Sequence, residues 1–241
     1  MEHYFDSFRG AEFTPEAIKG YQEDWKRLFY ERELVTLEED KEKLDKDPQK
    51  YARDYFKEVF LKFFKATRDI EDCNSDHQNI GELFRDCFPY CYTRHPNLDS
   101  FIDLGCGAGW PVAIASMLRY RAVGIERNLE VLTLGKEIFS ELKIGDERLM
   151  GGDYLQDTFW KSNHCGVNPV AQTLFLLYQP KKQIDMGLPF VSKNMHENSR
   201  IITGSDFFSS DDSEAMDQEL DQFNLQIETN LFGRYLILKK K

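Results

Sequence analysis

The segment Phe101–Pro111, with the sequence FIDLGCGAGWP, constrains this chain more than any other. Its apolar run predicts a buried strand, and the glycines that follow predict a tight turn leading into a helix. Glycines at three alternate positions, 105, 107 and 109, leave no side chain that would block a ligand from the backbone. Pro111 suits the first turn of a helix, where a missing N–H costs little. The segment therefore predicts a strand–turn–helix unit that holds a nucleotide-like ligand.

A second apolar run, Ala122–Glu126, predicts a neighbouring strand that ends in an acid. An acid at this place can accept hydrogen bonds from both ribose hydroxyls of an adenosine. The dinucleotide fingerprint G-x-G-x-x-G needs a third glycine where this chain has Trp110. The spacing G-x-G-x-G therefore points away from a dinucleotide and toward another adenosine cofactor.

The three motifs DLGCGAG, VGIE and GGDY, taken in this order, resemble the class I S-adenosylmethionine-dependent methyltransferases. The resemblance covers about residues 80–241 and implies S-adenosyl-L-methionine as the cofactor. It implies that Asp103 meets the amino group of the cofactor or its ordered waters, and that Glu126 holds the ribose. It further implies that Asp153 faces the adenine amine and that Tyr154 stacks on the adenine or lines its pocket. The remaining cofactor-binding residues that it implies are Gly105, Cys106, Gly107, Gly109 and Arg127.

The apolar run 173–178 ends in Tyr178, Gln179 and Pro180. In the resembled family, the residues after this strand lie beside the transferable methyl group, so Tyr178 and Gln179 are the predicted catalytic residues. Members that act on nucleobase amines or glutamine amides often carry [Asn/Asp/Ser]-Pro-Pro-[Tyr/Phe] here, and this chain does not. No residue is predicted as a general base. No metal site is predicted, because Cys87 and Cys91 lack C-x-x-C spacing.

The order of predicted elements favours an α/β fold in two parts. Residues 1–97 are predicted to form a helical N-terminal extension and residues 98–241 the cofactor-binding domain. In the second part strands and helices alternate, which is typical of parallel βαβ units. The strands are predicted at 100–104, 121–126, 147–150, 173–178 and 200–204, followed by a hairpin at 224–229 and 234–238. We therefore expect a mostly parallel seven-stranded sheet with helices on both faces and a C-terminal antiparallel hairpin.

The N-terminal extension carries an aromatic stripe at helical spacing over residues 51–64. We expect this stripe to pack on the cofactor-binding domain. We also expect residues 4–13 to fold over the cofactor or acceptor site as a mobile segment.

Composition limits the partners. The net charge of −11 argues against nucleic acid as a substrate, because a polyanion is repelled, and favours a basic partner. No apolar run approaches the length of about 20 residues that spans a membrane. An odd number of scattered cysteines, five, argues against a disulfide framework and predicts a cytoplasmic location.

These observations lead to one function and two alternatives. The predicted function is methylation of a protein lysine, since the helical extension, VGIE and the strand RIITGS also resemble non-SET protein-lysine methyltransferases. The Asn-Asn-Phe-type motif of the histone branch is absent. One alternative is a small-molecule methyltransferase with an N-terminal helical lid. The other is a regulatory partner that binds the cofactor without turnover.

Overall fold

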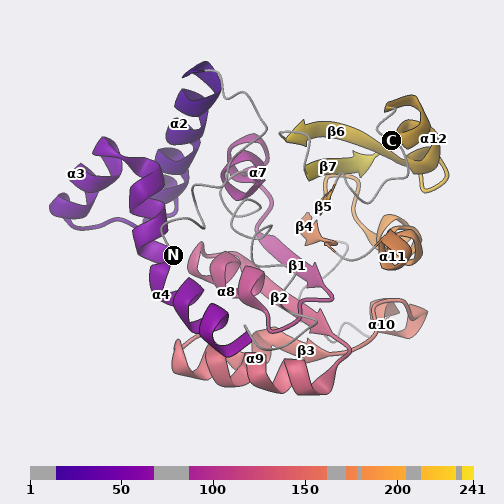
Figure 1. Ribbon diagram of the computed structural model, residues 1–241. Helices are drawn as coiled ribbons and strands as arrows, with labels where there is room; N and C mark the ends of the chain where they lie inside the picture. Colours follow the sequence, from indigo (N-terminus) through magenta and orange to yellow (C-terminus); the bar gives the residue numbers. More distant parts are fainter. Residues whose placement is uncertain (1–14, 68–86, 162–171, 179–180, 205–212, 232–234) are drawn as a thin grey trace. The chain divides into compact units, whose positions relative to one another are not determined.

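A computed structural model describes residues 15–67, 87–161, 172–178, 181–204, 213–231 and 235–241 (Figure 1). The boundary between two compact units falls between Pro96 and Asn97. No helix in these described ranges is long and apolar enough to cross a membrane. Within the same ranges, no group of three or more His, Cys, Asp or Glu side chains could hold a metal ion.

The first unit is helical. Its described helices are α2 (Pro15–Glu31), α3 (Glu38–Lys46), α4 (Pro48–Thr67) and α7 (Phe88–Arg94). Phe29 of α2 is fully buried and lies edge-on to Tyr51 and Tyr55 of α4, with ring centroids 5.2 Å apart in both pairs. The aromatic stripe was expected to need the other unit as its partner. Within the first unit, α2 contacts part of the stripe, at Tyr51 and Tyr55, and the packing of the stripe on the other unit stays a prediction. The segment 4–13, expected to cover the site, lies outside the described residues.

The second unit is built on a seven-stranded sheet in the order β3-β2-β1-β4-β5-β7-β6. Neighbouring strands are parallel except at β7, which runs antiparallel to both β5 and β6. The α/β fold with a mostly parallel seven-stranded sheet and an antiparallel C-terminal pair is therefore confirmed. The strands are β1 (Ser100–Leu104), β2 (Arg121–Glu126), β3 (Leu149–Gly151), β4 (Thr173–Leu176), β5 (Arg200–Gly204), β6 (Leu225–Leu231) and β7 (Tyr235–Lys240).

Helices follow the strands in the expected alternation. They are α8 (Trp110–Met117), α9 (Leu129–Glu141), α10 (Asp157–Lys161), α11 (Lys181–Asn194) and α12 (Ser213–Asp221). The predicted third strand began too early, because Asp146–Arg148 forms the short 3-10 turn η2 before β3 starts. The fourth strand was predicted to reach Tyr178, but β4 ends at Leu176.

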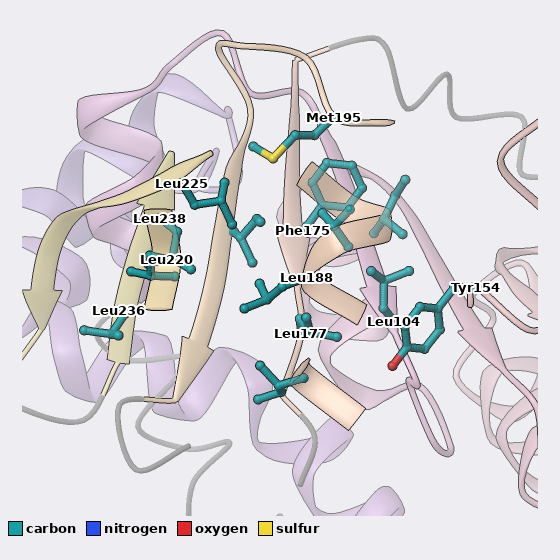
Figure 2. Close-up of a cluster of buried hydrophobic side chains, with 14 of the residues drawn as sticks. Leu104, Tyr154, Phe175, Leu177, Leu188, Met195, Leu220, Leu225, Leu236 and Leu238 are labelled. Atoms are coloured by element: carbon teal, nitrogen blue, oxygen red, sulfur yellow. The ribbon is translucent and has the colours of Figure 1, made fainter. Parts of the chain in front are cut away.

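A hydrophobic cluster covers one face of the sheet (Figure 2). It joins Leu104, Phe175 and Leu236 of the sheet to Leu188 of α11 and Leu220 of α12. Since side chains alternate along a strand, the residues between these strand positions point to the opposite face. The opposite face of β1 and β2 is covered by α8, whose Val112 packs closely over Gly124. The glycine turn leaves β1 at its carboxyl end, between these two layers.

Candidate functional site

The predicted glycine turn is present and is attached to β2. The N–H groups of Gly105 and Cys106 both donate to the carbonyl of Ile125, at 2.8 and 2.9 Å. Gly105, Gly107 and Gly109 have φ of 80°, 55° and 86°, a region that other residues adopt only with strain. A Cβ added at Gly107 would meet no atom within 4 Å. The turn therefore presents one open side, at Gly107, where a ligand can approach the backbone.

Glu126 bridges the glycine turn and the loop that follows β2. Its Oε2 accepts a hydrogen bond from the N–H of Gly107 at 2.9 Å, and its Oε1 accepts one from the N–H of Asn128 at 2.7 Å. A carboxylate has about four lone-pair positions, so each oxygen keeps one for a further donor. Glu126 is half-buried and lies beside the open side of Gly107. The arrangement suits two adjacent hydroxyls, the role predicted for this acid.

Asp103 and Cys106 lie beneath the turn and are both buried. Asp103 is opposite Gly124 of β2 and Leu176 of β4, in the interior of the sheet. The Cys106 thiol packs against Gly124, where an added Cβ would lie 2.6 Å from its Sγ. Burial, followed by the negative charges of Asp103 and Glu126, raises the pKa of this thiol well above its usual value. Cys106 therefore remains a neutral thiol that supports the turn from below, and it is not a nucleophile at neutral pH.

Asp153 and Tyr154 follow β3, as the GGDY motif predicts. The Asp153 carboxylate accepts from the N–H of Leu155 at 3.0 Å and from Nε2 of Gln156 at 3.2 Å, which fixes the turn before α10. Trp160 holds the same turn, because its Nε1 donates to the carbonyl of Tyr154 at 2.8 Å.

The ring of Tyr154 is buried at one end of the hydrophobic cluster (Figure 2), and its contact with an adenine remains a prediction. Burial raises its pKa to about 12, so the hydroxyl stays protonated and can donate.

The loop between Glu126 and α9 is more exposed. Arg127 is exposed, and Asn128 caps α9 by accepting from the N–H groups of Glu130 and Val131. Leu129, the first residue of α9, is 67% exposed although it is a large apolar side chain. Its Cδ2 lies 3.3 Å from a Cβ built on Gly151, the last residue of β3. Leu129 is not among the site residues predicted from the sequence. Its only sequence signal was an apolar residue at the helix start, three positions after the acid.

Tyr178 lies at the same end of the sheet as the turn. Asp103 of β1 is opposite Leu176, the last residue of β4, and Tyr178 follows two residues later. β4 borders β1 on the side away from β2, the strand that ends in Glu126. Tyr178 is half-buried. Gln179, the other predicted catalytic residue, lies outside the described residues.

Solved structures share this fold. A methyltransferase of Podospora anserina, solved with bound SAH, matches with a TM-score of 0.54 and 14% identity, over 76% of this chain and 88% of that one. The magnesium protoporphyrin IX methyltransferase of Synechocystis PCC 6803, solved with bound SAM, matches with a TM-score of 0.51 and 14% identity, over 81% of this chain and 98% of that one. The fold is that of the class I methyltransferases, as the three motifs predicted. No family model and no curated protein matches the sequence.

Proposed function

We propose that this protein is an S-adenosyl-L-methionine-dependent methyltransferase. The observation that carries the proposal is the Glu126 carboxylate, bonded to the glycine turn beside the open side of Gly107. A carboxylate, backbone N–H groups and space without side chains fit the ribose and methionine parts of the cofactor. The fold, and the SAH and SAM bound in the two similar structures, support the same conclusion.

The residues of the site have distinct roles in this proposal. Glu126 orients the ribose, the turn 105–109 lies against the methionine part, and the buried Asp103 fixes the polar groups of that part. Leu129 and Asp153 flank the adenine. When bound, the cofactor supplies a methyl group already activated as a sulfonium, so the protein contributes alignment and exclusion of water. Tyr178 lies at the acceptor end.

The proposed acceptor is a lysine of a basic protein segment. The net charge of −11 attracts such a segment and repels nucleic acid. The half-buried ring of Tyr178 offers an aromatic surface to an ammonium group. The amine would lose its proton to water before it accepts the methyl group, and the C–S bond would break as SAH leaves. The three described cysteines, at 87, 91 and 106, are free thiols, which agrees with our proposal of a reducing cytoplasmic compartment.

The first experiment asks whether the cofactor binds and where its methyl group goes. Calorimetry should detect SAH at micromolar affinity and no binding of NAD. The protein is then incubated with a radiolabelled methyl donor and a whole-cell lysate, and label is counted in the protein, RNA and small-molecule fractions. The lysine proposal requires label in protein that is lost with Glu126→Ala. Label in the small-molecule fraction alone would favour the lid alternative. Cofactor binding without label in any fraction would favour a regulatory partner.

A further inference from the structure

Tyr178 and Tyr235 come from different parts of the chain, but their rings are in contact. Their centroids are 5.9 Å apart and their planes are tilted by 42°. Tyr235, the first residue of β7, is 2% exposed, whereas Tyr178 is half-buried. The separation lies within the range in which aromatic pairs attract each other.

The sheet register explains why these rings meet. β4 and β5 are parallel with Leu176 opposite Ile202, so two residues further along Tyr178 is level with Gly204. Gly204 is in turn the partner of Tyr235 on β7. The order across the carboxyl edge of the sheet is therefore Tyr178, Gly204, Tyr235, with a glycine between the two aromatic residues.

The side chains of Tyr178 and Tyr235 point to the same side of the sheet. Leu177 and Leu236, the neighbours of the two tyrosines, both belong to the hydrophobic cluster on the opposite face. Alternation along the strands therefore directs Tyr178 and Tyr235 to the face that carries Asp103. Their Cα atoms are two strand spacings apart, about 10 Å. The rings come closer than that because Gly204 has no side chain to separate them.

We propose that Tyr235 is a positioning residue that holds the ring of Tyr178 at the acceptor end of the site. This inference rests on the proposed function. Tyr178 follows β4 at the carboxyl end of the sheet, between β1, which leads into the glycine turn, and Gly204 of β5, so we place its ring at the acceptor end. Tyr235 is too buried to touch the acceptor itself. It acts by restricting the orientations open to Tyr178.

A fixed tyrosine face selects for charge. An ammonium or methylammonium group over the ring is attracted by its quadrupole, while a neutral group of the same shape gains only apolar contact. The pair therefore assigns a cationic amine, rather than a neutral hydroxyl or carboxyl compound, as the acceptor class. If the ring of Tyr178 were free to rotate, part of this attraction would be lost to ordering the side chain.

The test uses tetramethylammonium chloride as the probe and tert-butanol as its neutral counterpart. Both are titrated into SAH-saturated protein labelled with ¹³C-tyrosine, and the Tyr178 signal is assigned by its loss in Tyr178→Phe. Tyr235→Phe keeps the ring and should bind tetramethylammonium within twofold of the unchanged protein. Tyr235→Leu should weaken binding between about twofold and tenfold, the range that an aromatic pair contributes. Phe223→Leu is the matched control, since Phe223 packs on the hydrophobic cluster away from this edge, and should leave probe binding unchanged.

The outcomes separate this inference from the proposed function. Calorimetry with SAH comes first, because a protein that does not bind SAH contradicts the proposed function itself. If SAH binds equally well to all variants and Tyr235→Leu binds the probe like the unchanged protein, the positioning role is wrong. Equal binding of tert-butanol and tetramethylammonium, or no probe binding at all, overturns the acceptor class. If Tyr235→Leu does not fold, Tyr235→Met offers an unbranched, more adaptable side chain of about the same volume as leucine and must give the same two- to tenfold weakening.

Discussion

Glu126→Gln is the change that tests the cofactor site most directly, because it keeps the shape of the side chain and removes its charge. In the structure both carboxylate oxygens accept a backbone N–H, from Gly107 at 2.9 Å and from Asn128 at 2.7 Å. Glutamine has one acceptor oxygen and one NH₂ donor. One of the two backbone N–H groups must therefore face another donor or lose its partner. In the proposed complex, the same substitution also removes an acceptor from one of the two ribose hydroxyls.

The expected loss follows from these contacts. A hydrogen bond to a charged group contributes about 1.5–3 kcal/mol, and an unsatisfied donor costs a similar amount. Glu126 is half-buried, so water compensates part of this loss, and we expect about 2 kcal/mol in the binding of SAH. That corresponds to a Kd weakened by about thirtyfold. Glu126→Asp keeps the charge but is one methylene shorter, so it should also fail to span both N–H groups.

Two measurements check this reasoning. Calorimetry gives the Kd for SAH, and amide hydrogen exchange without ligand reports whether the N–H of Gly107 or of Asn128 loses protection. Glu130→Gln is the matched control, because it is the same carboxylate-to-amide substitution at an exposed residue on the first turn of α9. If Glu126→Gln binds SAH within twofold of the unchanged protein, or if both amides keep their protection, the assignment of Glu126 as ribose acceptor and brace is refuted.

Four further changes test other parts of the site. Gly124→Ala puts a Cβ 2.6 Å from the Sγ of Cys106 and should lower the free energy of unfolding by about 1–3 kcal/mol in thermal melts, with partial recovery in the double variant with Cys106→Ala. The pKa of Tyr154 is raised to about 12 from a usual value of 10, so the protonated hydroxyl should stabilise the fold below pH 10. About 2–3 kcal/mol of this contribution should be lost as the pH rises to 12. The difference in free energy of unfolding between the unchanged protein and Tyr154→Phe, measured in urea, should therefore shrink over this range. Leu129→Ser should leave the melting temperature unchanged, because Leu129 is 67% exposed, but should weaken SAH binding; unchanged affinity would exclude Leu129 from the adenine site. Tyr178→Phe should lower turnover of a protein acceptor more than it lowers SAH affinity, and an equal loss in both would move Tyr178 to the cofactor side.

Local patterns in the sequence were sufficient to predict the strand–turn–helix unit and the sheet. The φ values of Gly105, Gly107 and Gly109 are those that the glycine spacing requires. The apolar runs around them place β1 and β2 correctly, because buried parallel strands have continuous apolar sequences. The boundary of β3 was missed by two residues because the turn Asp146–Arg148 contains only charged side chains, whose sequence does not distinguish a 3-10 turn from a strand end.

Contacts between distant segments could not be predicted in the same way. Part of the aromatic stripe on α4, at Tyr51 and Tyr55, contacts Phe29 of α2, because helical spacing identifies an apolar face but not the residues that pack against it. The pairing of Tyr178 with Tyr235 depends on β7 lying next to β5, a strand order that requires the chain to cross over. Glu126 was selected for its position, but its bond to the N–H of Gly107 depends on how the turn folds back over β2.

The packing beneath the glycine turn determines how well the site is formed before a ligand arrives. A Cβ at Gly124 would collide with Cys106, and a Cβ at Gly135 of α9 would lie 2.5 Å from the carbonyl of Ala108. Both glycines therefore let the turn lie close against β2 and α9. Together with the two bonds of Glu126, these contacts hold the turn from below and from one side. Because the turn has little freedom left to lose, the ordering cost of binding falls mainly on the ligand and on the acceptor end. Under the proposed function, selection of the acceptor therefore depends on residues outside the turn, and Tyr178 is the described residue that we propose for this role.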